Sequence, residues 1–258
     1  MKLKKIFNFL EKEKKVKFSI ITVVKNDKTN IESTIKSLSS QNFSDYEHII
    51  IDGNSSDGTS EVIKKAIRNQ KKINYIRKKD KNLYQALNRG IKIAKGDFVG
   101  ILHSGDMYFN NKVLKLVNSK ITNEIDILSG FLIYVDSNLK KKRLWNYKIK
   151  NLNEYNASKI AHPSTFISKK VFKKIGYYNI SYTIASDTDF LLRVSKIPNI
   201  SFMLVQRTFI AMKIGGLSTS YLRIFRKIYE DLKIYFFHFK FLFLPIYVKK
   251  IIYKIRIN

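Results

Sequence analysis

Asp106 stands where an apolar run of the chain ends at a carboxylate. Residues 99–102 read Val-Gly-Ile-Leu, and a short polar turn then leads to Asp106. An apolar run bounded by turn residues is typical of a buried strand. Open α/β sheets bind their ligands at the carboxyl ends of the strands, so Asp106 is placed to hold a metal ion or a charged substrate.

Two further runs deliver polar residues in the same way. Residues 19–24 are mostly β-branched and lead to the polar turn 25–27, and the run 48–51 ends at Asp52. The carboxyl ends of parallel strands meet at one edge of a sheet. Three strands are therefore expected to present polar residues at the same edge.

The elements that must position these residues alternate along the chain. Hydrophobic periodicity predicts strands at 18–24, 48–51, 73–76 and 98–102, and helices at 31–38, 62–67 and 84–94. Successive strand-helix-strand units predict an α/β fold with a doubly wound, mostly parallel sheet and flanking helices. A Rossmann dinucleotide fold is the main rival, but no Gly-x-Gly-x-x-Gly motif follows the first strand.

The composition allows a sizeable core and favours anionic partners. The chain has 258 residues, of which 45% are hydrophobic, and it has no cysteine. Disulfides and thiolate metal sites are therefore excluded. The formal net charge of +29 favours nucleic acid, an anionic membrane leaflet or phosphorylated substrates as partners. A compositionally biased genome is the alternative explanation, because lysines occur along the whole chain.

The two ends of the chain differ from its middle. Residues 1–17 are predicted to form a basic amphipathic helix, and no secretory signal fits them. In residues 221–258 aromatic and apolar residues alternate with basic ones, which predicts a helical tail on an anionic membrane surface rather than a membrane span. The alternative is a terminal helix packed on the core. The basic residues expected to face the lipid are Lys233, Lys240, Lys249, Lys250, Lys254 and Arg256.

Four ordered motifs resemble those of family-two glycosyltransferases of the GT-A fold. They are the first strand with its loop at 19–26, Asp-Gly-Asn-Ser-Ser-Asp-Gly-Thr at 52–59, the segment 80–90 followed by Lys-Gly-Asp, and Ser-Gly-Asp at 104–106. Ser104 stands where the family's Asp-x-Asp motif has its first carboxylate. The resemblance predicts a GT-A domain over residues 18–220.

The second half of the chain resembles the acceptor side of the same enzymes. Residues 161–166 are similar to their His-x-(Ser/Ala)-x-Phe segment, and residues 186–190 to their Glu-Asp-x-(Asp/Glu)-Leu motif. By that match Asp187 is the catalytic base, and His162 and Asp189 belong to the acceptor side. Gly216 and Ser218 belong to a segment similar to the flexible loop that follows.

The resemblance also implies which residues bind the donor and the metal. A nucleotide diphosphate gains negative charge as it leaves, and a divalent cation on a hard carboxylate neutralises that charge. Mn²⁺ or Mg²⁺ is therefore expected at Asp106, with His162 as a second candidate ligand. The residues expected to bind the nucleotide and its sugar are Thr22, Val24, Asn26, Asp52, Asn88, Ser104, Gly105 and Asp106.

Several of these assignments have alternatives. Asp187 and Asp189 could exchange roles, because one is the base and the other orients neighbours or caps the helix. A structural role is the alternative to contact with the donor for Asp52, Asp57, Tyr84 and Asn88. For His162 a structural role is the alternative to contact with the metal or the acceptor.

The activity expected from the resemblance is inverting, metal-assisted transfer of a hexose or N-acetylhexosamine. The donor is a nucleotide-sugar, most simply a UDP-sugar, and the acceptor is a saccharide or lipid-linked saccharide of a surface polysaccharide. The expected location is cytoplasmic, on the inner face of the plasma membrane. A nucleic-acid-binding protein and a catalytically inactive membrane-bound scaffold are the alternatives. No nucleic-acid reader motif is found, and the presence of Asp106 and Asp187 speaks against the scaffold.

Overall fold

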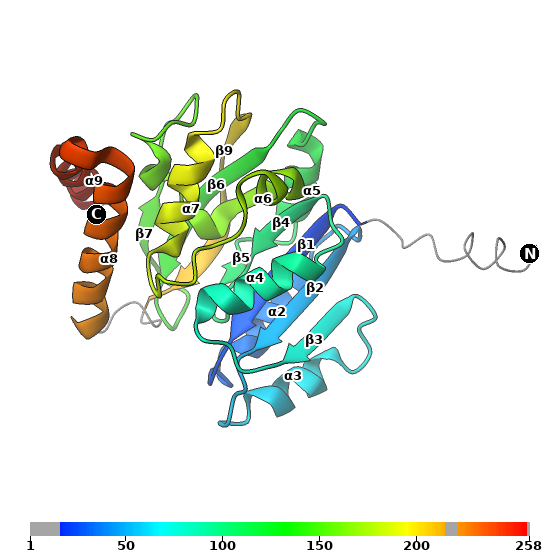
Figure 1. Ribbon diagram of the computed structural model, residues 1–258. Coiled ribbons are helices and arrows are strands. Elements are labelled where there is room, and N and C mark those ends of the chain that lie inside the picture. The colour runs from blue at the N-terminus through cyan, green and yellow to red at the C-terminus, as the bar shows by residue number, and fades with distance from the viewer. Residues whose placement is uncertain (1–15, 215–220, 257–258) are drawn as a thin grey trace, which may run out of the picture.

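The protein folds around one mixed β-sheet. The computed structural model describes residues 16–214 and 221–256 (Figure 1). Within these residues the strands are hydrogen-bonded in the order β3-β2-β1-β4-β8-β6-β9-β5, and β7 pairs with β6. Their bounds are β1 Phe18–Val24, β2 Tyr46–Asp52, β3 Ile73–Arg77, β4 Phe98–Ile101, β5 Met107–Tyr108, β6 Ile127–Val135, β7 Lys141–Trp145, β8 Thr165–Ser168 and β9 Phe202–Lys213.

The first half of the sheet is the parallel sheet that the periodicity predicts. β1 pairs in parallel with β2 and β4, and β2 pairs in parallel with β3. Strands β1, β2 and β4 are almost entirely buried, which explains their continuous apolar sequences. Val24 and Asp52 are register partners at the ends of β1 and β2. The loops after these strands therefore leave from the same edge.

The second half of the sheet is mixed rather than parallel. β8 runs antiparallel to β4 and β6, while β6 is parallel to β9. β5 follows Asp106 directly and pairs antiparallel with β9, with Met107 opposite Ala211. The pairing of β5 with β9 therefore anchors the residues that directly follow the turn carrying Asp106.

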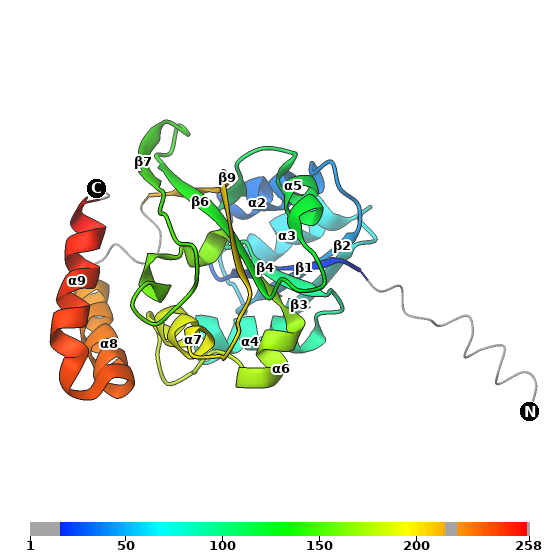
Figure 2. The same cartoon turned by 90° about the horizontal axis from the view of Figure 1, so that it is seen from above.

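Helices cover both faces of the sheet (Figure 2). One face carries α2 (Ile31–Ser39), α3 (Thr59–Ile67) and α5 (Val113–Lys120), and the other carries α4 (Leu83–Ile93), α6 (Lys169–Ile175) and α7 (Ser186–Ser195). The three helices predicted before residue 95 are confirmed. The chain also forms short 3₁₀ turns, η1 (Ala157–Lys159) and η2 (His162–Ser164).

The C-terminal tail forms a pair of helices beside α7, α8 (Tyr221–Phe239) and α9 (Phe243–Arg256), joined by η3 (Lys240–Leu242) (Figures 1 and 2). One face of the pair is packed, because Ile234, Tyr235 and Tyr247 are buried. The other face exposes apolar side chains such as Phe237 and Phe241. Packing on the core, the alternative to a membrane surface, therefore holds for one face of the tail. The other face is exposed to solvent.

Lys250 corrects one expectation for the tail. Its ammonium lies 2.9 Å from the carboxylate of Asp231, and both side chains are buried. The rings of Tyr235 and Tyr247 also contact this ammonium. Lys250 therefore joins α9 to α8 and does not face a lipid surface.

Among the helices of residues 16–214 and 221–256, none has the length and apolarity that crossing a bilayer requires. The basic helix expected at 1–17 lies, as far as residue 15, outside the described residues.

Candidate active site

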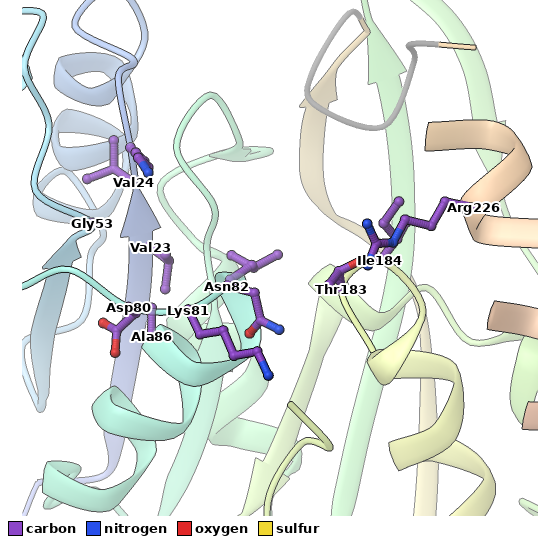
Figure 3. A pocket seen from close by; sticks show the side chains of 12 residues that line it. Val23, Val24, Gly53, Asp80, Lys81, Asn82, Ala86, Thr183, Ile184 and Arg226 are labelled. Carbon is purple, nitrogen blue, oxygen red and sulfur yellow. The ribbon is translucent and has the colours of Figure 1, made fainter. Parts of the chain in front are cut away.

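A cavity of about 480 Å³ opens at the carboxyl ends of β1 and β2. Figure 3 shows its two sides. One side consists of residues 23–25, Gly53 and the start of α4, and the other consists of Thr183, Ile184 and Arg226. Among the predicted donor contacts, Val24 lies in the cavity wall. The volume falls in the range of sites for small molecules.

Asp52 organises the loop that follows β2. Its buried carboxylate accepts hydrogen bonds from the backbone N–H and hydroxyl of Ser55, at 2.8 and 2.6 Å, and from the hydroxyls of Ser60 and Tyr75, at 2.5 and 2.9 Å. Burial raises the pKa of Asp52, but these hydrogen bonds hold it below its ordinary value. Each carboxylate oxygen thus accepts two hydrogen bonds from the protein, and Asp52 fixes the loop that places Gly53 in the cavity wall.

Asn26 and Thr22 also make their contacts inside the protein. Asn26 has a φ of 52°; its N–H donates to the Ser55 hydroxyl and its side-chain oxygen accepts from the Ser56 N–H, both at 2.9 Å. Thr22 is fully buried, and its hydroxyl lies 2.9 Å from Nε2 of His48. The contact of Thr22 with the donor stays a prediction, and its hydroxyl is directed to His48 inside the protein.

The turn before Asp106 is fastened to neighbouring elements. Gly105 has a φ of +93°, a left-handed conformation that favours glycine. Its N–H donates to the Thr34 hydroxyl at 3.0 Å, and that hydroxyl donates to the carbonyl of Asp106 at 2.9 Å. The Ser104 hydroxyl donates to the carboxylate of Asp27 at 2.6 Å. Gly105 and Ser104, both predicted as donor contacts, therefore hold the turn in place.

Asp106 is a buried carboxyl group with one unpaired oxygen. The residue is 5% exposed, and Oδ2 has no hydrogen-bond partner. Burial raises the pKa of Asp106 to about 8. A buried carboxylate oxygen without a partner is unfavourable unless a ligand or cation pairs with it.

Asp106 could supply one hard oxygen ligand to a divalent cation. Mg²⁺ is commonly held by one or two carboxylates together with substrate phosphates and water. In the part of the chain that the structure describes, no three His, Asp or Glu side chains gather around a candidate metal position. Asp106 would therefore be the principal protein ligand, and a bound diphosphate and water would supply the others.

Asp187 lies in the first turn of α7, near the start of α4. Its Oδ1 accepts a hydrogen bond from the Thr188 N–H at 2.9 Å and lies 3.3 Å from the hydroxyl of Tyr84. The same Tyr84 hydroxyl donates to the carbonyl of Ile184 at 2.7 Å. Asp187 is partly exposed. Tyr84, for which packing was the alternative role, thus contacts the predicted base.

Two imidazoles lie within electrostatic range of Asp187. Burial lowers the pKa of His103 to about 4, and the neighbouring His162 contributes to the decrease while Asp187 opposes it. Burial likewise lowers the pKa of His162 against the opposing charge of Asp187. Both rings are therefore neutral near pH 7. His103 directly precedes the Ser-Gly-Asp motif at 104–106 and was not among the predicted site residues.

His162 and Asn88 meet at Tyr178. Nε2 of His162 lies 2.6 Å from the Tyr178 hydroxyl. The side chain of Asn88 donates to the carbonyl of Tyr178 at 2.8 Å and accepts from its N–H at 3.0 Å. Tyr178 also packs on Phe190 of α7. Asn88 therefore ties α4 to the segment before α7, and Nε2 of His162, one of its two candidate ligand atoms, is already paired.

Asp189 connects α7 to the tail. Its buried carboxylate accepts a hydrogen bond from Nε of Arg193 at 2.9 Å and lies 3.1 Å from Nε2 of His238 in α8. Burial raises the pKa of Asp189, but His238 and Arg193 hold it below its ordinary value. The Asp189 carboxylate is thus occupied by Arg193 and His238. Gly216 and Ser218, expected in the acceptor loop, lie outside the described residues.

Helix α8 contributes to the site, although none of its residues was among the predicted site residues. Arg226 extends from α8 toward Thr183 and Ile184 in the cavity wall (Figure 3). Glu230, one turn further along, contacts the backbone of the same loop. The amphipathic pattern of the tail predicts a helix but does not indicate which segment a polar residue contacts.

Comparison with known proteins agrees with the motifs. Residues 19–176 match Glycosyl transferase family 2. An uncharacterized glycosyltransferase of Mycobacterium tuberculosis is 28% identical over 181 residues, which cover 69% of this chain and 68% of that protein. A glycosyltransferase of Mycobacterium bovis named for PGL/p-HBAD biosynthesis is 26% identical over 179 residues, which cover 68% of each chain.

Solved structures of low sequence identity share the fold. Staphylococcus aureus TarS in complex with UDP-GlcNAc has a TM-score of 0.69 at 19% identity, with 85% of this chain and 66% of that chain covered. Mannosyltransferase PcManGT from Pyrobaculum calidifontis, in complex with GDP-Man and Mn²⁺, has a TM-score of 0.65 at 13% identity, with 90% and 68% covered. This chain thus spans slightly less than two thirds of that TarS structure. The match over residues 19–176 shows that the chain belongs to Glycosyl transferase family 2 and is a glycosyltransferase with a GT-A-like fold.

Proposed function

We propose that this glycosyltransferase moves a sugar from a nucleotide-sugar donor to a saccharide or lipid-linked saccharide, with inversion at the anomeric carbon. The observation that carries the proposal is the placement of two carboxylates. Asp106 lies in the loop after β4 with one unpaired oxygen, and Asp187 contacts Tyr84, whose hydroxyl also binds Ile184 in the cavity wall. His103 links the two, because it lies three residues before Asp106 and within electrostatic range of Asp187. Asp106 is assigned to the leaving group, and Asp187 is assigned to the attacking hydroxyl.

Asp187 is proposed as the general base. Its carboxylate takes the proton of the acceptor hydroxyl as that oxygen attacks the anomeric carbon and the bond to the diphosphate oxygen breaks. A single displacement of this kind inverts the configuration. The hydroxyl of Tyr84, 3.3 Å from Oδ1, helps to hold the carboxylate in one orientation.

Asp106 is proposed to hold Mn²⁺ or Mg²⁺ beside the donor diphosphate. A cation bound there neutralises the negative charge that the leaving nucleoside diphosphate gains. Lys25, Lys81 and Arg226 in the cavity wall add positive charge near the same ligand. The names of the structural neighbours, in complex with UDP-GlcNAc or with GDP-Man and Mn²⁺, support a nucleotide-sugar as the donor.

The donor is proposed to be a UDP-hexose or UDP-N-acetylhexosamine. The complexes of TarS with UDP and with UDP-GlcNAc have TM-scores of 0.67 and 0.69. The mycobacterial relative named for PGL/p-HBAD biosynthesis supports a surface glycolipid or polysaccharide as the product.

The exposed face of the tail is proposed to bind the anionic inner face of the plasma membrane. Phe241 is 98% exposed, and large exposed apolar surfaces commonly mark interaction sites. Basic side chains beside such a surface can attract anionic lipid while their stems lie along the apolar part. The exposed residues that would take part are Phe225, Tyr229, Phe236, Phe237, Phe241, Leu244, Lys233, Lys240 and Lys249.

The first prediction concerns the cation. Mn²⁺ binding to the protein with UDP present should be lost or greatly weakened in Asp106→Asn, because the amide lacks the charge of a carboxylate. In the wild type the cation competes with the proton of Asp106, whose pKa is about 8. Affinity should therefore rise with pH, by up to about tenfold per unit below pH 8, and level off above it. Calorimetric titration measures both effects, and equal Mn²⁺ affinity in the variant would remove Asp106 from the cation site.

The second prediction separates the two acidic residues of α7. Asp187→Asn keeps the shape of the side chain but removes its basicity, so transfer should fall by about 10²-fold or more while UDP binding survives. Asp189→Asn should mainly lower the melting temperature, because it weakens the contacts with Arg193 and His238. Transfer rates normalised to folded protein provide the comparison, and the reverse ranking would make Asp189 the base.

The third prediction concerns the exposed face of the tail. Replacing Phe237 and Phe241 together by Ser should weaken binding to phosphatidylglycerol vesicles at least about tenfold, since two large apolar side chains no longer enter the interface. Leu139→Ser is the matched control, because Leu139 is 55% exposed but lies outside the tail. Co-sedimentation measures the binding. Unchanged binding of the double variant would rule out this face as the membrane contact.

A further inference from the structure

The tail helix α8 contributes a carboxylate to the segment that precedes the proposed base. Glu230 is 4% exposed and lies against residues 183–185, which connect to the first turn of α7. Oε1 accepts hydrogen bonds from the N–H and hydroxyl of Thr183, at 2.9 and 2.8 Å. Oε2 accepts from the N–H groups of Ile184 and Ala185, at 2.9 and 3.0 Å. One side chain thus satisfies three consecutive backbone donors.

This contact holds the three residues that lead into α7, including its N-cap residue Ala185, from a distant part of the chain. The first N–H groups of a helix have no partner within it and normally need a side chain or water. Ala185, the N-cap residue of α7, offers no side-chain cap. A carboxylate is the favourable group at this end of a helix, because it accepts hydrogen bonds and complements the helix dipole. Hydrogen bonding to the 183–185 backbone and to Thr183 holds the pKa of Glu230 below its ordinary value against the effect of burial.

The segment held by Glu230 also determines where Asp187 lies. Ala185 is two residues before Asp187, and the carbonyl of Ile184 accepts the Tyr84 hydroxyl that also contacts the Asp187 carboxylate. Release of residues 183–185 would therefore move both the backbone of Asp187 and its Tyr84 contact. Thr183 and Ile184 also line the cavity, together with Arg226 from the same helix as Glu230.

We propose that Glu230 is a positioning residue for the reaction, holding the start of α7 so that Asp187 meets the acceptor hydroxyl. The proposal rests on the proposed role of Asp187 as base. It makes α8 a working part of the active site, although α8 lies outside the residues that match the family.

The test compares Glu230→Ala and Glu230→Gln with Asp231→Asn. Asp231 is the next residue and equally buried, but its carboxylate pairs with Lys250 instead of the loop. Transfer is measured with the UDP-sugar and acceptor that the wild type uses, found by screening UDP-hexoses and UDP-N-acetylhexosamines. UDP affinity and melting temperature are measured on the same samples.

Glu230→Ala should lower kcat about 10²-fold and Glu230→Gln about tenfold, with UDP affinity within about threefold of the wild type. The Gln variant keeps one acceptor oxygen and the shape of the side chain. Its kcat can therefore be measured even if the Ala variant fails to fold. Asp231→Asn should lower the melting temperature but keep kcat of the folded protein within about twofold. Wild-type kcat in Glu230→Gln, or an equal loss of kcat in Asp231→Asn, would overturn the proposal.

A double variant shows whether Glu230 acts through the base. If it does, Glu230→Gln added to Asp187→Asn should lower transfer little further, because the group being positioned is already missing. Independent, multiplying losses would overturn the proposal. Full activity of Asp187→Asn alone would refute the base itself, whereas an inactive Asp187→Asn beside a fully active Glu230→Gln would refute only the role of Glu230.

Discussion

Parallel pairing of β1 with β2 and β4 is the constraint on which the site depends. It sends the loops after these strands to one edge, where their backbone N–H groups have no strand partner. Neighbouring loops and α2 supply the partners: Ser55 binds the N–H of Asn26, and Thr34 binds that of Gly105. The polar side chains of the motifs therefore stabilise the loops at this edge of the sheet. Asp106 is left with an oxygen that no protein group occupies, which is the property a ligand site requires.

Strands β1, β2 and β4 of the parallel half could be predicted because they are almost entirely buried and have continuous apolar sequences. The antiparallel pairing of β8 with β4 and β6 could not be predicted, because hydrophobic periodicity does not specify which distant strand is the partner. The same limit applies to the site. Motifs identified Asp52 and Thr22 by type and position, but not the four donors around Asp52 or the burial of Thr22 against His48.

The tail illustrates this limit most clearly. Its pattern of aromatic and basic residues predicted helices with an exposed apolar face, and both are present. The opposite face holds Glu230 against residues 183–185 and His238 against Asp189, contacts between segments more than forty residues apart. A boundary at residue 220 would therefore separate α7 from two side chains that hold it. Helix α8 is thus proposed to hold the start of α7 with one face and to bind a membrane with the other.

The central claim is that sugar transfer occurs by one displacement, with Asp187 as the base. The anomeric configuration of the product tests it most directly, because one displacement inverts the configuration and two restore it. Proton NMR of the first product formed from an α-linked UDP-sugar measures this through the coupling constant of the anomeric proton. A single displacement gives a β-linked product, and an α-linked product would contradict Asp187 as the base of a single displacement.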